Sequence, residues 1–220
     1  PVVLTELLEA KIIGPYVPPR MADKVAAEFK SPLLAQRLST KVLMYSEEAY
    51  PAGSPVTNLW QLTTADWNGK VVMVDPLQRG DYLDLMTEIV LQSDAMAKAY
   101  EAQFGKAIEL GESKTAGEKF IRDLFANGLV LVKSTDDVNS AVGKKGQKAP
   151  PVGFTTYSDR RDNEDEGWAL QVANNVAPAP GIVFPAVVAI ANGAKNPAAA
   201  RLAIDFLMGD DSETGGAGFK

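Results

Sequence analysis

Two short polar stretches of this 220-residue sequence stand where a small ligand could bind. Each follows an apolar run and precedes an amphipathic segment: Arg79-Gly80-Asp81 follows residues 71–74, and Ser134-Thr135 follows residues 129–132. The start of a helix carries free backbone N–H groups and the positive end of the helix dipole. Both stretches therefore predict sites for a small anion.

Each stretch also has a structural interpretation. Gly80 can supply a turn, and Asp81 can cap a helix with its carboxylate, which would then take the N–H groups that an anion needs. Ser134 and Thr135 are both common helix caps, an interpretation that competes with ligand contact. Arg79 either adds a positive charge to the site or faces solvent. Arg-Gly-Asp is also an adhesion tripeptide, but strand and helix signals flank it here, which makes adhesion the weakest alternative.

The composition excludes several kinds of site. The sequence contains no cysteine and no histidine, so it offers no disulfide, no thiolate nucleophile, no Ser-His-Asp triad and no histidine metal ligand. A metal ion would need oxygen ligands, which suit hard cations. The formal net charge is −6, so nucleic acid is not expected as a partner. No apolar run reaches the roughly 18 residues of a membrane-spanning helix, so direct membrane insertion is not expected.

Strand and helix patterns alternate along the chain, which predicts an α/β fold. Apolar and β-branched runs predict strands at residues 41–46, 71–74, 129–132, 150–159, 168–172 and 182–190. Apolar residues at helical spacing predict helices at residues 5–11, 21–29, 82–90, 93–104, 117–126, 136–142 and 197–207. In the last of these helices, Leu202, Phe206 and Leu207 are expected on the buried face.

Several stretches, taken in order, resemble the class II solute-binding proteins of ABC importers, the group that includes the ferric-binding proteins. In the first half of the chain the resemblance is carried by Tyr45-Ser46, Pro55, Trp60–Leu62, Trp67–Val71 and Asp75-Pro76. In the second half it is carried by Ala189-Ile190, Gly193-Ala194, Asn196-Pro197, Ala200 and Asp205–Leu207. Between them, "VGFTTYSD" is similar to the strand that brings tyrosine to the ligand cleft of these proteins.

This resemblance implies a two-lobed fold of the periplasmic-binding-protein type. Residues 1–45 and 167–220 would form the first lobe and residues 46–166 the second, joined by crossing strands. Family members have further segments on both sides of the matching part. We therefore expect an incomplete first lobe and a chain that lacks an N-terminal portion and a C-terminal tail.

The resemblance also implies a function that is not enzymatic. The protein would capture a small polar solute between its lobes by hinge closure, in the periplasm or outside the cell, and deliver it to an ABC permease in the membrane. A periplasmic sensor of such a solute is one alternative, and an enzyme on a related two-lobe scaffold is another. The expected solute carries a phosphate, phosphonate or carboxylate group, or is ferric iron bound with an anion.

The same resemblance assigns the candidate ligand contacts. By position, Arg79, Gly80 and Asp81 inherit the anion-binding role, and Ser134 and Thr135 lie at the second helix start. The remaining contacts would be Thr155, Thr156, Tyr157, Tyr45 and Ser46, the last two being either hinge or cleft lining. Iron-binding members carry two adjacent tyrosines, whereas Ser158 follows Tyr157 here. Tyr157 is thus a single candidate metal ligand, and no cofactor is expected apart from iron as a transported ligand.

Overall fold

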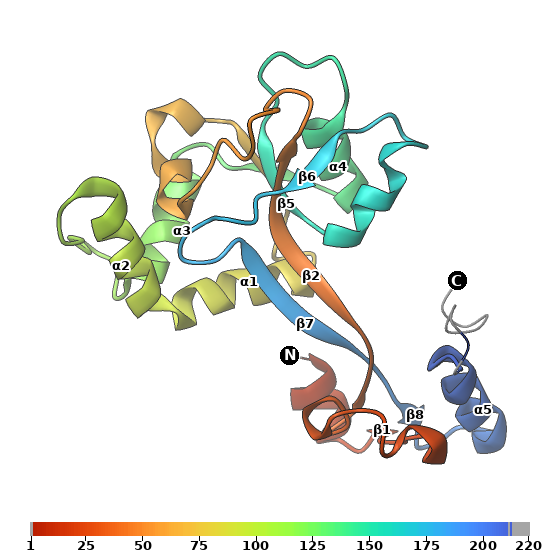
Figure 1. The fold of residues 1–220 in the computed structure, drawn as a ribbon. Coiled ribbons are helices and arrows are strands. Elements are labelled where there is room, and N and C mark those ends of the chain that lie inside the picture. The colour runs from red at the N-terminus through yellow and green to blue at the C-terminus, as the bar shows by residue number, and fades with distance from the viewer. Residues whose placement is uncertain (1, 211, 213–220) are drawn as a thin grey trace. The chain divides into compact units, whose positions relative to one another are not determined.

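The computed structural model describes residues 2–210 and 212 (Figure 1). The chain divides into two compact units, one formed by Thr40–Val183 and the other by Pro1–Ser39 together with Phe184–Lys220. Two strands, β2 (Leu34–Ser46) and β7 (Gly181–Val188), each continue from one unit into the other. The lobe boundaries expected from the sequence, after residues 45 and 166, stay a prediction.

The larger unit is built on a mixed sheet with the strand order β4-β3-β5-β2-β6, and β7 pairs with β2. Three strands are parallel: β3 (Val71–Val74), β4 (Val130–Val132) and β5 (Val152–Thr155). Strand β2 runs antiparallel to β5 and to β6 (Leu170–Val172). Helices follow the parallel strands, so the predicted α/β fold class is confirmed.

Four α-helices belong to this unit, and in each the apolar residues are spaced so that one face is buried. They are α1 (Gly80–Leu91), α2 (Ser93–Phe104), α3 (Ala116–Ala126) and α4 (Thr135–Gly143). Helix α4 packs on β3 and β5, and α3 packs on both α1 and α2. These contacts fix where α1 and α4 begin relative to the sheet.

Trp60 lies at the centre of the packing beside α2 and α3. Its ring is fully buried, lies edge-to-face against Tyr100 and Phe120, and donates its N–H to the carbonyl of Met96 over 2.8 Å. A buried indole needs such a partner, because an unpaired N–H in the core is costly. The aromatic cluster therefore holds the helical layer together without contributing to a site.

The smaller unit contains a two-stranded antiparallel ribbon, β1 (Ile13–Gly14) with β8 (Ile190–Ala191), and the helix α5 (Pro197–Leu207). Asn196 caps α5 by accepting the N–H of Ala199. The core of this unit is small and consists of Leu34, Ile204 and Met208 with partly buried neighbours.

The structure corrects several sequence predictions. Leu202, Phe206 and Leu207 of α5 are exposed, because the helix turns the side of Ile204 toward the small core instead. Only the 3-10 turns Pro19–Met21 and Ala27–Phe29 form around the helix expected at 21–29. Short helices need tertiary packing to persist, and in this segment only Met21 and Val25 pack, partly buried, against the small core.

Two further segments differ in type or length. The helix expected at 5–11 is a π-helix at Val3–Leu8. The strand expected at 150–159 ends at Thr155, and a 3-10 helix occupies Tyr157–Asn163. Within residues 2–210 and 212, no helix combines the length and the apolar character needed to cross a membrane.

Candidate functional site

The carboxyl ends of the three parallel strands meet at one edge of the sheet. Helix α1 begins after β3, α4 begins after β4, and Thr156 follows β5. Because β2 runs antiparallel to β5 with Val42 opposite Thr155, Lys41 reaches the same edge. Ligands of open α/β sheets collect outside the carboxyl ends of strands. We call the residues gathered here the sheet-edge site: Lys41, Arg79–Tyr82, Thr135 and Thr156.

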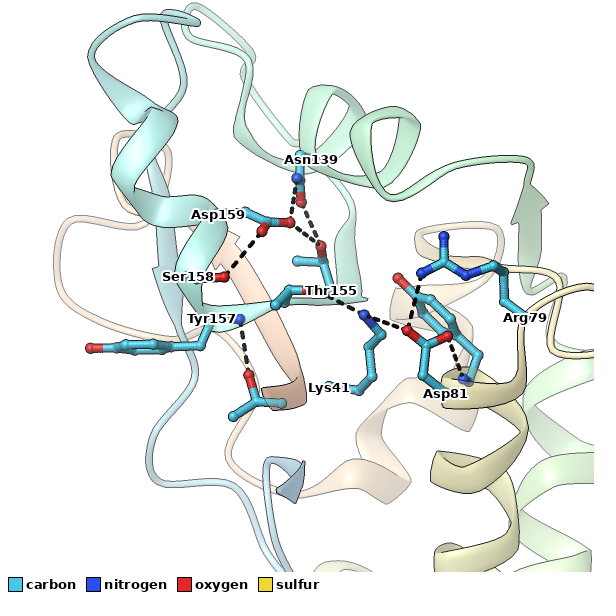
Figure 2. A network of polar contacts seen from close by, with 11 residues as sticks. Lys41, Arg79, Asp81, Asn139, Thr155, Tyr157, Ser158 and Asp159 are labelled. Carbon is cyan, nitrogen blue, oxygen red and sulfur yellow. Dashed lines mark hydrogen bonds and ion pairs between the residues drawn. The ribbon is translucent and has the colours of Figure 1, made fainter. Parts of the chain in front are cut away.

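Lys41 is the buried charge of this site. Its side chain is 3% exposed, and its Nζ lies 3.1 Å from Asp81 Oδ2 and 2.8 Å from Thr156 Oγ1 (Figure 2). The same Nζ lies 4.8 Å from the centre of the Tyr82 ring. Two of the three ammonium N–H groups thus have oxygen partners in the protein, which leaves one donor for a further group.

Asp81 joins the two cations of the site. Its Oδ2 also lies 3.1 Å from Arg79 Nη2, and its Oδ1 accepts the backbone N–H of Tyr82 over 3.1 Å. Burial alone would raise the pKa of Asp81, but the hydrogen bonds and charges of Lys41 and Arg79 outweigh it and hold that pKa below its usual value. The carboxylate is therefore ionised at neutral pH, and two cations face one anion.

Backbone donors remain free at both helix starts. Asp81 takes only the N–H of Tyr82, and in the described part of the chain no acceptor faces the N–H groups of Gly80, Asp81, Thr135 and Asp136. Ser134 is occupied as the N-cap of α4, since its Oγ accepts the N–H of Asp137 and its own N–H donates to the Asp137 carboxylate. Helix-start donors of this kind suit an oxyanion.

The hydroxyl of Tyr82 is buried beside these donors. The residue is fully buried, and its Oη has no hydrogen-bond partner within the described residues. Burial raises the pKa of Tyr82 to about 12, and the Thr135 side chain lowers it by a smaller amount. Thr135 lies near Oη, but the two groups do not meet the geometry of a hydrogen bond. The phenol consequently stays protonated at physiological pH.

A network of hydrogen bonds lies beside the sheet-edge site and involves Thr155, the residue before Thr156. Thr155 is fully buried and donates to Asn139 Oδ1 over 2.5 Å, while Asn139 Nδ2 donates to Asp159 Oδ2 over 2.8 Å (Figure 2). These bonds tie α4 to the end of β5 and to the 3-10 helix that follows. Thr155 is therefore satisfied within the protein and supports the neighbouring Thr156.

Comparisons with known proteins bear on this arrangement. The substrate-binding protein of an ABC transporter from Agrobacterium tumefaciens superimposes with a TM-score of 0.63 over 95% of this chain and 56% of that chain, at 14% identity. Iron-bound HitA from Pseudomonas aeruginosa gives a TM-score of 0.62 over 95% and 61% of the two chains, at 18% identity. This chain has the fold of ABC-transporter substrate-binding proteins.

A third solved structure with this substrate-binding-protein fold is the periplasmic binding protein AfuA from Actinobacillus pleuropneumoniae with fructose-6-phosphate bound. It gives a TM-score of 0.60 at 17% identity and covers 95% of this chain and 60% of AfuA. The chain thus spans about three-fifths of the length of these structures. No family model matches the sequence, and no curated protein matches it either. The resemblance drawn from the sequence is confirmed at the level of the fold.

On this substrate-binding-protein fold, the predicted contacts separate into two groups. Arg79, Gly80, Asp81, Thr135 and Thr156 come together at the sheet-edge site, with Ser134 and Thr155 beside it in structural roles. The structure places three predicted residues elsewhere: Tyr157, Tyr45 and Ser46. Whether any of these residues contacts a ligand stays a prediction.

Tyr157 is directed away from Lys41 and Asp81 (Figure 2). Its side chain is 48% exposed, its hydroxyl accepts from Arg160 Nη1 over 3.1 Å, and the Arg160 guanidinium stacks on its ring. In the part of the chain that the structure describes, no group of three acidic, histidine or cysteine side chains could hold a metal ion. Among the described residues, Tyr157 thus has no such cluster of acidic ligands beside it.

Tyr45 and Ser46 lie further along β2, beyond the residues opposite β5. They pair with Gln171 and Leu170 of β6 and are buried. Tyr45 lies four positions from Lys41 along the strand, which corresponds to about 13 Å. The ring of Tyr45 contacts that of Tyr50 edge-to-face at 6.5 Å. Both residues pack within the sheet, and their role in a hinge or cleft stays a prediction.

Sequence reasoning missed Lys41, the Tyr82 hydroxyl and the Asn139–Asp159 pair. The available signal for Lys41 was a charged residue directly before the apolar run Val42–Tyr45. Tyr82 was assigned to the apolar stripe of its helix, which is correct for its ring but overlooks its hydroxyl. Asn139 carried no signal, because a polar residue on a short helix normally faces solvent.

Proposed function

We propose that this protein is the substrate-binding component of an ABC importer and binds a small polar solute through an anionic group at the sheet-edge site. The observation that carries this proposal is the buried Lys41 ammonium at the edge where α1 and α4 begin. It would act in the periplasm or outside the cell and deliver the solute to a membrane permease. Closure of two lobes around the solute stays a prediction.

The charges of the site favour an anion. Lys41 and Arg79 together outnumber Asp81, and Arg79 is 45% exposed, so most of its N–H groups remain available. Four free backbone N–H groups add further donors at the positive ends of two helices. Because the whole chain carries a net charge of −6, attraction for an anion has to come from such local groups.

Ferric iron is a weaker candidate for the bound solute. HitA is an iron-bound structure with the same fold, which keeps iron under consideration. Tyr157 is, however, turned away from the site and held by Arg160. One phenolate without further oxygen ligands is a poor site for a hard cation that prefers several. An oxyanion is therefore the favoured solute, and an iron–anion complex ranks below it.

A thermal-shift screen, followed by calorimetry of the hits, tests the proposal. The panel consists of inorganic phosphate, methylphosphonate, acetate, citrate, ferric citrate, putrescine and glucose. An anion at 100 times its dissociation constant should stabilise the folded protein by about 2.7 kcal/mol. We expect hits confined to oxyanions, whereas a flat panel, or stabilisation by putrescine or glucose alone, would contradict the proposal.

Matched lysine variants connect any hit to the site. Lys41→Met removes the buried ammonium, and we expect it to weaken the binding of the hit at least about tenfold, or about 1.4 kcal/mol. Lys119→Met is the control, because Lys119 forms an ordinary pair with Asp123 one turn along α3. Equal affinities for the wild type and both variants would place the binding site elsewhere.

A further inference from the structure

The Tyr82 side chain combines a packed ring with an unsatisfied hydroxyl. It lies in the first turn of α1, fully buried, with the Lys41 ammonium 4.8 Å from its ring centre. The ring thus has packing partners that account for its burial. Its Oη has no hydrogen-bond partner among the described residues.

Such a hydroxyl requires an explanation. Buried polar groups are nearly always hydrogen-bonded, and an unpaired one destabilises the fold. Phenylalanine would fill the same volume without that cost. Most groups around the hydroxyl belong to the sheet-edge site: the Thr135 side chain lies near it without hydrogen-bond geometry, and the charges of Asp81 and Arg79 act on it. The charge of Asp159, beside the site, acts on it as well. The missing partner is therefore expected at the site.

We propose that the Tyr82 hydroxyl is a specificity-determining donor, which hydrogen-bonds an oxygen of the bound anion. This inference rests on the proposed function and adds to it a residue and a ligand class. Because Tyr82 is fully buried, an anion reaches its hydroxyl only if a neighbouring side chain moves, and the proposal assigns that movement to the exposed side chain of Arg79, which lies beside Asp81. The anion then satisfies the buried phenol and the free backbone donors together.

The set of donors indicates the class of anion. The site offers N–H groups of Gly80, Asp81 and Thr135 in addition to the phenol, and the Lys41 ammonium retains one donor. A carboxylate presents two oxygens, whereas a phosphate or phosphonate group presents three or more. The phosphoryl group can accept from more of these donors, so the site is assigned to a solute with a phosphate or phosphonate group.

The variant Tyr82→Phe separates this role from a structural one. It removes only the hydroxyl and retains the packed ring. In phosphate-free buffer we expect its thermal midpoint to equal or exceed that of the wild type, because an unsatisfied group is removed. The control is Tyr50→Phe in the same unit, since the Tyr50 hydroxyl donates to the Pro150 carbonyl over 3.4 Å. That variant should show an unchanged or lower midpoint.

Binding of inorganic phosphate and methylphosphonate is then measured by calorimetry for the wild type and both variants. We expect Tyr82→Phe to weaken the tighter of the two at least about tenfold and Tyr50→Phe to leave it unchanged. If Tyr82→Phe lowers the ligand-free midpoint, the hydroxyl has a partner without ligand, such as a buried water, and the inference is wrong.

The remaining outcomes distinguish this inference from the proposed function. Wild-type binding of phosphate or methylphosphonate with an unchanged affinity in Tyr82→Phe would overturn the role of the hydroxyl and leave the proposed function standing. Wild-type binding of carboxylates alone would overturn the ligand class and retain the anion site. Failure of the wild type to bind any oxyanion would overturn both.

Discussion

Lys41 and Asp81, which lie 40 positions apart in the sequence, form an ion pair of 3.1 Å at the edge of the larger sheet. The lysine side chain is almost completely buried, while the aspartate is 21% exposed and is shared with Arg79. The burial of the two partners is thus unequal. The loss of folding stability should therefore differ between a variant that removes the lysine charge and one that removes the aspartate charge.

We expect Asp81→Asn to lower the free energy of unfolding by about 3 kcal/mol, because it leaves a buried ammonium without its counter-charge. Lys41→Met should cost less, since Asp81 retains Arg79 and contact with water. Urea unfolding of both variants and of the double variant Lys41→Met/Asp81→Asn measures the difference. Equal losses in the two single variants would contradict the unequal burial of the pair.

The pair should also make stability depend on pH. The pKa of Asp81 in the folded protein lies below its usual value, so the unfolded chain binds a proton more readily than the folded one. The stabilisation is therefore fully present above the unfolded pKa of about 3.9 and is lost as pH falls through the folded pKa.

Unfolding of the wild type and Asp81→Asn across a pH series tests this dependence. We expect the difference in unfolding free energy between them to be constant from pH 7 to about pH 5. Below about pH 4 it should shrink, as the wild-type carboxylate takes up its proton. A difference that already disappears between pH 7 and pH 5 would show that another group governs it.

Gly153 controls the contact between β5 and α4. A Cβ at this position would lie 2.7 Å from Val138 Cγ1 and 2.9 Å from the Val72 carbonyl oxygen. We expect Gly153→Ala to destabilise the protein by about 1–3 kcal/mol, because the methyl group forces α4 away from the sheet. Gly80→Ala is the stability control, since no atom lies within 4 Å of its Cβ. Equal stability of both variants would contradict the close packing of α4.

The position of Tyr157 predicts the response to iron. Its hydroxyl is held by Arg160 and directed away from Lys41 and Asp81, so we expect no visible tyrosinate-to-iron charge-transfer band when ferric citrate is added. An absorption titration of the wild type and Tyr157→Phe measures this. A band that appears in the wild type and is lost in Tyr157→Phe would restore Tyr157 as a metal ligand.

The local sequence was sufficient for much of the secondary structure of the larger unit, although not for the end of β5 or the 3-10 helix that follows it. The apolar run at 71–74 and the helical spacing from Tyr82 to Val90 predict β3 and α1 closely, and the cap at Ser134 predicts the start of α4. The spacing of apolar residues and the caps of helices depend on residues close together in the sequence, so they can be recognised without knowledge of the fold. The two candidate anion sites at helix starts followed from the same local signals.

Contacts between distant segments could not be predicted in this way. The register of β2 against β5, with Val42 opposite Thr155, is what brings Lys41 to Thr156 and Asp81. A shift of one residue in that register would turn the Lys41 side chain to the other face of the sheet. The site thus depends on strand pairing rather than on any motif.

The sequence by itself determined the order of the main strands and α-helices of the larger unit, the absence of histidine and cysteine chemistry, and the two helix starts at Arg79 and Ser134. Only the tertiary structure decided that Lys41 is buried against Asp81, that the Tyr82 hydroxyl lacks a hydrogen-bond partner among the described residues, and that Tyr157 turns away from both Lys41 and Asp81. The physical reason is that secondary structure follows from local periodicity and capping. Burial and pairing instead depend on which distant side chains the sheet and its helices bring together.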